Sequence, residues 1–348
     1  MGPPFKRRLT ARLIPIVLWT ATAGALLPLL AAWLTPARLH DHGRLFTAWS
    51  FAAFMIRTFT FQAALGLLLT ALLALLLRHR YAAATAGLPA ALIIAACCVR
   101  SPRAAPPPPG AHTLTVLTHN LLFINNNPQP TLDLIAAENP DLILFQEYTP
   151  AMHASLSPAL AANYPYQAHA FRDNSYGEAV YSRRPFLGNP LYTTDATSPD
   201  GAPFRTGNGP QYTVRIDLAG TPITIHNVHT DAPGSLALYR SQRRQFQHLA
   251  ALAAADDGPA VFAGDFNATC ASQHLAALED AGLADALDAP ALGRHCTWCD
   301  RTVLQWLPGI RIDHILHSRQ LACAAAHVGA PTGSDHRPVI ATLYLRNK

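Results

Sequence analysis

Polar residues that could handle a proton, a cation or a phosphate group follow short apolar stretches at six places in the chain. A strand that runs from the core to its end is a rigid mount for a reactive side chain. Each segment alone also has an ordinary structural explanation, such as a turn asparagine or an exposed glutamate, so only their combination is informative. The six segments are Thr118-His119-Asn120, Phe145-Gln146-Glu147, Asn227-Val228-His229, Gly264-Asp265-Phe266-Asn267, Arg311-Ile312-Asp313-His314 and Ser334-Asp335-His336.

In this order the segments resemble the endonuclease/exonuclease/phosphatase superfamily, over a range from about Leu114 to Leu345. The most specific matches are GDFN at 264–267 and SDHRPV at 334–339. They are supported by LFQE at 144–147, RIDHIL at 311–316 and Gly177 with Ser182-Arg183-Arg184-Pro185. The superfamily includes deoxyribonuclease I, abasic-site endonucleases, neutral sphingomyelinases and inositol polyphosphate phosphatases. The resemblance implies a metal-dependent phosphoester or phosphoanhydride hydrolase.

Such a hydrolase needs a divalent cation on the phosphate oxygens, an activated water and a stabilised leaving oxygen. Mg²⁺ prefers oxygen ligands, keeps bound water and takes one or two carboxylates. The resemblance makes Glu147 the principal metal ligand, with Asn120 beside it. Asp335 either completes the metal shell or supports His336. We therefore expect Mg²⁺ as the cofactor, with Mn²⁺ as the alternative.

The resemblance also gives catalytic roles to five residues. His336 matches the general base, and imidazole titrates near neutral pH. Asp313 matches the carboxylate that orients this base. Asp265 and Asn267 match the pair that orients the water and binds the phosphoryl oxygens, and His229 matches the residue that contacts phosphate or protonates the leaving group. The implied reaction is in-line hydrolysis without a covalent intermediate.

Three further histidines, His119, His226 and His314, are predicted to be structural. His119 and His314 each adjoin a site residue, and successive side chains on a strand point to opposite faces. His226 is three residues before His229, which is also an opposite-face spacing. A zinc site built from these histidines lacks a recognisable ligand spacing.

The elements that position these residues follow a mixed α/β pattern. Many short strands and few helices predict an α/β (α+β) four-layer sandwich, in which two packed mixed sheets are covered by outer helices. Helices are expected at Thr131–Asn139, bounded by prolines, and at Leu236–Ala255. Strands are expected at His112–Thr118, Leu142–Phe145, Thr221–Val228, Val261–Ala263, Ile312–Leu316 and Pro338–Leu345.

Three apolar stretches, Leu13–Leu34, Thr58–Leu77 and Tyr81–Val99, occupy the first hundred residues. Each is near the roughly 20 residues that cross a bilayer as a helix. We therefore predict a membrane domain at 1–100 with three transmembrane helices, a Pro-rich linker at 101–110 and a catalytic domain at 111–348. The alternative for the first stretch is a cleaved signal peptide, because Lys6, Arg7 and Arg8 precede it.

Basic residues near the predicted spans indicate an orientation. The cluster of Lys6, Arg7, Arg8 and Arg12 favours a cytoplasmic N-terminus. Three crossings would then place the catalytic domain outside the cytoplasm, on the outer face of the cell membrane. The linker, SPRAAPPPPG, is expected to be an extended spacer that keeps the catalytic domain close to the bilayer.

Charge is divided unevenly between the two parts. Residues 1–110 hold eleven Lys/Arg and one acidic residue, a net charge of +10, whereas residues 111–348 hold fifteen Lys/Arg and twenty Asp/Glu, a net charge of −5. Nucleic-acid affinity depends on Lys/Arg contacts with phosphates, so the acidic part argues against a nucleic-acid partner.

The expected substrate is therefore lipid-linked phosphate or pyrophosphate presented at a membrane. The arrangement resembles teicoplanin-resistance (VanJ-type) membrane proteins, which implies a polyprenyl pyrophosphate phosphatase connected with envelope synthesis and glycopeptide tolerance. A tethered nuclease and a sphingomyelinase-like phosphodiesterase are the enzymatic alternatives. A non-enzymatic receptor or scaffold would be favoured by loss of a catalytic position, and none is lost.

Four cysteines lie in the predicted catalytic domain. Cys296-Thr297-Trp298-Cys299 has CxxC spacing but lacks the context of a redox or zinc site. Thr297-Trp298 also matches a strand segment of the superfamily, so it is expected in the core sheet. An oxidising compartment permits a disulfide, for which we predict Cys270 with Cys296 or Cys299.

Overall fold

The computed structural model describes residues 3–36, 43–98, 104–193, 211–287, 296–298 and 309–346. The chain divides into two compact units, Met1–Arg100 and Ser101–Lys348. The first unit is helical. Its elements are α1 (Pro3–Trp33), α2 (Arg44–Thr58), α3 (Thr60–Leu76) and α4 (Arg80–Cys98).

Helices form at all three apolar stretches, but the described residues do not support the predicted count of three membrane spans. Only Leu13–Trp33, with 21 residues, is long and apolar enough to cross a bilayer by itself. The second stretch breaks at Phe59, where α2 and α3 meet at a bend of 64°, so the pair is at most one broken span. The apolar part of α4, Arg80–Ala96, is a shorter helix, at the lower limit of the length that crosses a bilayer.

The second unit consists of two six-stranded sheets. One sheet has the order β11-β12-β1-β2-β4-β3 and the other β5-β6-β7-β8-β10-β9. Each sheet is mixed, because β1 and β2 are parallel in the first and β7 and β8 are parallel in the second. The strands are β1 (Thr113–Asn120), β2 (Leu142–Gln146), β3 (Tyr166–Ala170), β4 (Glu178–Ser182), β5 (Leu191–Thr193), β6 (Gln211–Leu218), β7 (Thr221–His229), β8 (Ala260–Asp265), β9 (Ala284–Asp285), β10 (Asp313–His317), β11 (Leu321–Val328) and β12 (Val339–Leu345).

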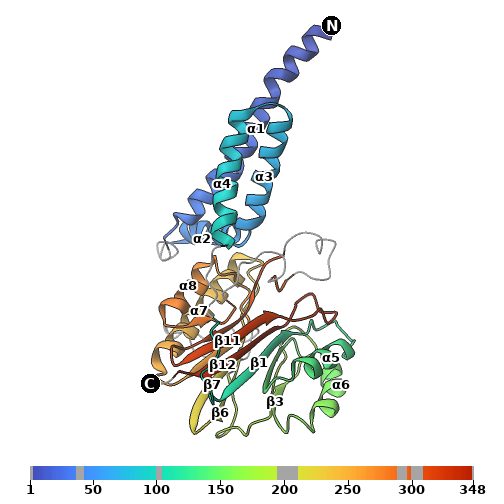
Figure 1. Cartoon of the computed structure of the whole chain (residues 1–348), viewed down its shortest axis with the longest axis vertical. Coiled ribbons are helices and arrows are strands. Elements are labelled where there is room, and N and C mark those ends of the chain that lie inside the picture. The colour runs from blue at the N-terminus through green and yellow to red at the C-terminus, as the bar shows by residue number, and fades with distance from the viewer. Residues whose placement is uncertain are drawn as a thin grey trace. The chain divides into compact units, whose positions relative to one another are not determined.

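Helices cover the outer faces of the two sheets (Figure 1). Helices α5 (Gln129–Glu138) and α6 (Pro150–Leu160) pack their apolar side chains on the first sheet. Helices α7 (Leu236–Ala255) and α8 (Gln273–Asp280) flank the second sheet, where Phe246 of α7 packs against Phe266. The main core, which includes Val116, Leu144, Ile225 and Val261, lies between the sheets. The predicted sandwich of two mixed sheets with outer helices is confirmed.

The strand directions bring the ends of many strands to one edge of the sandwich. The parallel strands β1, β2, β7 and β8 all end there, at or directly before Asn120, Glu147, His229 and Asp265. The antiparallel neighbours β10 and β12 begin at the same edge, so Asp313 and the residues before Val339 also arrive there. This topology gathers segments separated by more than 200 residues into one site.

Candidate active site

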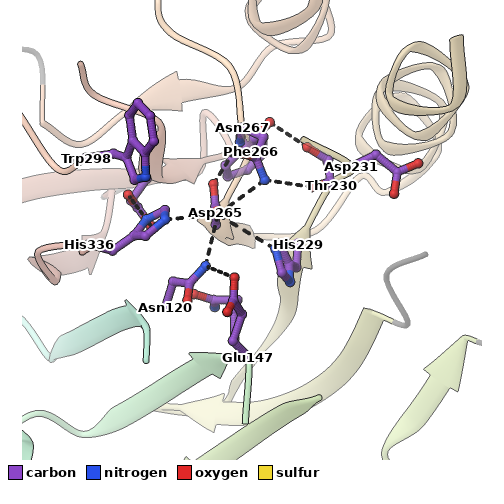
Figure 2. Close-up of polar contacts among 12 residues, drawn as sticks. Asn120, Glu147, His229, Thr230, Asp231, Asp265, Phe266, Asn267, Trp298 and His336 are labelled. Carbon is purple, nitrogen blue, oxygen red and sulfur yellow. Dashed lines mark hydrogen bonds and ion pairs between the residues drawn. The ribbon is translucent and has the colours of Figure 1, made fainter. Parts of the chain in front are cut away.

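A pocket of about 270 Å³ lies at this edge of the second unit. Six of the eight predicted site residues line it, and Figure 2 shows most of them converging from the two sheets. Asn120 and Asp313 lie behind the lining and contact it through hydrogen bonds. The lining residues are Glu147, Ser175, Tyr176, His229, Thr230, Asp231, Ala232, Leu238, Asp265, Asn267, Trp298, Asp335 and His336.

His336 and Asp313 form the pair expected of a base and its orienting carboxylate. The Nδ1 atom of His336 lies 2.9 Å from Oδ2 and 3.2 Å from Oδ1 of Asp313, and both residues are buried. The backbone N–H of His336 donates to Ser334 Oγ, whose hydroxyl donates to the carbonyl of Asn120. These bonds leave Nε2 of the ring facing Asp265, 3.7 Å from its Oδ2.

Asp265 is the centre of the polar contacts in the pocket (Figure 2). Its Oδ2 accepts from Asn120 Nδ2 at 3.1 Å and from Asn267 Nδ2 at 3.2 Å, and its Oδ1 accepts from the Asn267 backbone N–H at 2.8 Å. Nε2 of His229 lies 3.7 Å from the same Oδ2. Two imidazole rings and two amides are therefore held around one carboxylate.

Glu147 is fixed at the other side of Asn120. Its Oε1 accepts from Asn120 Nδ2 at 3.0 Å, and its Oε2 accepts from the Phe123 backbone N–H at 2.9 Å. Gly177 makes room for this segment, since a Cβ at Gly177 would lie 1.9 Å from the carbonyl oxygen of Tyr148. The carboxylate is positioned by backbone geometry and one side chain.

Burial and charge perturb the titration of these groups. Burial alone would lower the pKa of His336, but the carboxylates of Asp313 and Asp265 raise it to about 10. Burial raises the pKa of Asp265 to about 6, against the opposing effect of His336. Burial lowers the pKa of His229 and raises that of Glu147. Groups with opposed shifts in one pocket are typical of acid–base sites.

A ring as basic as His336 is an imidazolium at neutral pH, whereas a general base must be neutral. A cation that enters the pocket would repel the second proton of the His336 ring and so lower the pKa of His336. The carboxylates around His336 therefore keep its ring protonated until a cation neutralises their charge. The same carboxylates favour the binding of a cation in the pocket.

The profile of the Endonuclease/Exonuclease/phosphatase family matches residues 117–336, from β1 to the proposed base. The chain belongs to this family. The predicted superfamily is therefore confirmed. Members of the family hydrolyse phosphoesters and generally depend on a metal ion, so the chain is a hydrolase of this family and the pocket is its candidate active site.

Solved structures share the fold of the second unit. The endonuclease/exonuclease/phosphatase from Beutenbergia cavernae DSM 12333 has a TM-score of 0.52 and 22% identity, covering 67% of this chain and 72% of that chain. The family protein from Bacteroides vulgatus has a TM-score of 0.53 and 20% identity, covering 67% and 99%. A humanized TDP2 from D. rerio has a TM-score of 0.52 and 19% identity, covering 66% and 98%. At these identities the similarity shows the fold alone. No curated protein matches the sequence.

The residues present fit a hard divalent cation of the kind that this family uses. Glu147, Asn120 and Asp335 would offer two carboxylates and an amide oxygen, which Mg²⁺ prefers. Oδ1 of Asp335 is buried without a partner among the described residues. Asp265, Asp313 and His336 could also present one ligand atom each within 4.8 Å. The oxygen set matches the ligand preference of Mg²⁺, whereas the second set is the one whose ligand atoms the structure brings close together.

The sequence argument missed several residues of the pocket wall. Asp231 lies two residues after His229, and its Oδ2 is buried without a partner among the described residues. Ser175 and Tyr176 come from the loop before Gly177. The position of Asp231 directly after a strand was a usable signal, whereas the loop residues carry no motif of their own.

Thr297-Trp298 is not part of the core sheet, contrary to the prediction. Trp298 makes only isolated bridges, to Ile310 and His336. The Thr297 hydroxyl accepts from the backbone N–H groups of Ile312 and Asp313, and the Trp298 indole donates to Asp335 Oδ2 at 3.2 Å. The segment therefore supports two site carboxylates.

The three other histidines are held away from the reaction. His119 contacts Thr332 and His226 contacts Thr213. His314 lies between Asp285 Oδ2, at 2.8 Å from Nδ1, and the Ala268 carbonyl, at 2.9 Å from Nε2. Arg311 also binds Asp285, and this buried cluster ties β9 and β10 to the turn after Asn267.

The predicted disulfide between Cys270 and Cys296 is not formed, and the alternative pairing with Cys299 involves a residue outside the described ones. Cys270 and Cys323 are free thiols, and the Cys296 thiol donates to the carbonyl of Gly309. The spacing of the cysteines in the chain held no information on how their side chains point.

Proposed function

We propose that this chain is a membrane-anchored phosphohydrolase that acts on lipid-linked phosphate or pyrophosphate, with polyprenyl pyrophosphate as the substrate class. The observation that carries the proposal is the combination, in one chain, of a hydrolase pocket and a 21-residue apolar helix near the N-terminus. The net charge of −5 over residues 111–348 favours a lipid over a nucleic-acid substrate. Envelope metabolism or glycopeptide tolerance is the corresponding cellular role.

In this proposal His336 takes a proton from the attacking water through Nε2, and Asp313 stabilises the imidazolium that forms. Asp265 and Asn267 orient the water and the phosphoryl oxygens. His229, on the opposite side of Asp265, supplies a proton to the leaving oxygen or a hydrogen bond to the phosphate. Mg²⁺, or Mn²⁺ in its place, held by Glu147, Asn120 and Asp335 would supply Lewis-acid polarisation of the phosphate. Water attacks in line, so no covalent enzyme intermediate is needed.

Substrate class is tested with purified full-length protein in detergent and Mg²⁺. The proposal predicts release of inorganic phosphate from undecaprenyl pyrophosphate, and loss of this release in His336→Ala. Cleavage of plasmid DNA without phosphate release would instead identify a nuclease. Cleavage of sphingomyelin to phosphocholine would identify the phosphodiesterase alternative.

With Leu13–Trp33 as a single crossing, the basic N-terminal cluster favours an active site outside the cytoplasm, and this is the proposed orientation. Reporter fusions after Lys348 test this orientation. Alkaline phosphatase is expected to be active there and a cytoplasmic fluorescent reporter dark. The reverse pattern would place the active site in the cytoplasm.

A further inference from the structure

Three large apolar side chains are exposed beside the active-site pocket. Phe123, Ile124 and Phe171 have exposed fractions of 40%, 63% and 42%. We call these three residues the apolar rim. The other large hydrophobic residues exposed in the described part of the second unit are Tyr166, Leu187 and Leu191. Isolated exposed hydrophobic residues are ordinary, but a group at a functional site calls for a partner.

Hydrogen bonds place the apolar rim on the two sides of Glu147 and Tyr148. The backbone N–H of Phe123 donates to Glu147 Oε2 at 2.9 Å, and Ile124 follows it. On the other side, the N–H of Arg172 donates to the carbonyl of Tyr148 at 3.1 Å, which fixes the neighbouring Phe171. Both loops are thus attached to the segment that carries the proposed metal ligand.

Aromatic contacts and the pocket lining give the same placement. The Phe171 ring stacks on His153 with centroids 4.8 Å apart, and His153 packs edge-on against Tyr148 at 5.8 Å. The loop that begins with Phe171 continues to Ser175 and Tyr176, which line the pocket together with Glu147. The three rim residues do not line the pocket themselves, but the loops that carry them are attached to the segment of Glu147, which does line it.

From this juxtaposition we infer that the apolar rim binds the hydrocarbon chain of the substrate where it leaves the phosphate site. The inference rests on the proposed function and specifies which surface recognises the lipid. A phosphate held in the pocket must direct its organic group towards one wall. The hydrophobic effect stabilises the contact of an apolar wall with a hydrocarbon chain, but it does not stabilise contact with a sugar or a nucleotide backbone.

The test compares two prenyl pyrophosphates of very different chain length. Farnesyl pyrophosphate and isopentenyl pyrophosphate share the reacting group, and both are water-soluble, so a difference between them does not need a bilayer. In the full-length triple variant Phe123→Ser/Ile124→Ser/Phe171→Ser, KM for farnesyl pyrophosphate is expected to rise about tenfold, the factor given by 1.4 kcal/mol of lost contact. KM for isopentenyl pyrophosphate is expected to stay as in the unmodified protein.

Leu187→Ser is the matched control, because Leu187 is 41% exposed but is attached to Arg215 of β6 rather than to the Glu147 segment. It should leave both KM values unchanged. An equal change for both substrates in the triple variant, or no change for farnesyl pyrophosphate, would overturn the inference. So would an effect confined to substrate embedded in vesicles, which would make the apolar rim a bilayer contact.

A binding measurement separates failure of this inference from failure of the proposed function. Calorimetry with the non-hydrolysable thiolodiphosphates of the two chain lengths does not require turnover. Tighter binding of the farnesyl analogue, lost in the triple variant, would support the apolar rim even if no pyrophosphate is hydrolysed. Equal affinity of the unmodified protein for both analogues would contradict it even if hydrolysis is observed.

Discussion

Asp265 is the residue on which the contacts of the pocket converge. One of its oxygens accepts from two amides and lies 3.7 Å from two histidine rings. Asp265 could be predicted as a site residue from the sequence because it lies in GDFN, a motif specific enough to assign roles. The same holds for His336 and Asp313, whose hydrogen bond joins segments 23 residues apart. Tyr176 could not be predicted, because its place depends on how a loop folds over the strand ends, whereas Asp231 was missed although it lies just beyond the end of β7.

Asp313→Asn is expected to lower kcat by about 10² to 10⁴ while changing KM little, because the neutral amide no longer stabilises the imidazolium. Burial lowers the pKa of His336, and Asp313 is the main group that raises it to about 10. Removing that charge should lower the His336 pKa and move the acidic limb of the pH–kcat profile to lower pH. Steady-state kinetics over a pH series would show this, and an unshifted limb would argue against the Asp313–His336 pair as the base.

Glu178→Gln is expected to stabilise the protein increasingly as the pH rises. Glu178 is fully buried at the start of β4, and burial raises its pKa well above 4.5 despite a hydrogen bond from the Tyr212 N–H. Because the folded state holds its proton more tightly than the unfolded state, the native protein loses stability as the pH rises above about 4.5.

Thermal unfolding at pH 5 and pH 8 measures this effect. The gain in Tm of Glu178→Gln should be larger at pH 8 than at pH 5. Asp280→Asn, which changes an exposed carboxylate, serves as the control and should show no such trend. A gain that is equal at both pH values would mean that Glu178 is not protonated in the folded protein.

At the scale of elements, the site depends on close approach of β7 and β8. Gly264 has φ +154°, and a Cβ there would lie 1.8 Å from the carbonyl oxygen of Val228. Gly264→Ala should therefore separate the two strands, displace Asp265 and lower the free energy of unfolding by more than about 1 kcal/mol. Activity should fall with it.

Gly188→Ala separates this clash from simple backbone strain. Gly188 also has a positive φ, +87°, but no atom lies within 4 Å of an added Cβ. It should cost some stability and leave activity intact. Denaturant unfolding and kcat of both variants decide the matter, and equal activity loss in the two would remove the close strand approach from the explanation.

Elements with strong apolar patterns could be predicted closely. The helix Leu236–Ala255 has the predicted bounds, and β2, β7 and β12 agree with prediction within a residue at each end. Helix α2 was not predicted, because, apart from its last residue, it lies outside the three apolar stretches that were expected to be helices. The Thr297-Trp298 segment was misplaced because its residues favour a strand, whereas Trp298 forms isolated bridges to Ile310 and His336.

At the scale of the whole molecule, composition separates a basic apolar unit from an acidic catalytic one, and the structure also divides into two units. The apolar composition of the first hundred residues predicted three spans, because composition does not show where a helix breaks. The break at Phe59 leaves α3 with 17 residues. The sequence therefore predicts the existence of an apolar unit more reliably than the number of times that this unit would cross a bilayer.

The anchor predicts that the full-length protein stays in the membrane fraction after carbonate washing and is released by detergent. The 21-residue helix Leu13–Trp33 supplies the apolar surface. Membrane fractionation with intact-mass analysis distinguishes a membrane anchor from a cleaved signal sequence. A soluble product that has lost its N-terminus would show that the helix is a signal sequence and not an anchor.

The pocket around Asp265 is proposed to hydrolyse lipid pyrophosphate with the help of a divalent cation. The most direct test of this proposal is phosphate release from undecaprenyl pyrophosphate by the full-length protein, with Mg²⁺ and with EDTA. Glu147→Gln is compared with Asp280→Asn, which keeps the pocket unchanged. We predict Mg²⁺-dependent release that survives in Asp280→Asn and is lost in EDTA and in Glu147→Gln. Release that persists in EDTA, or at full rate in Glu147→Gln, would contradict the account.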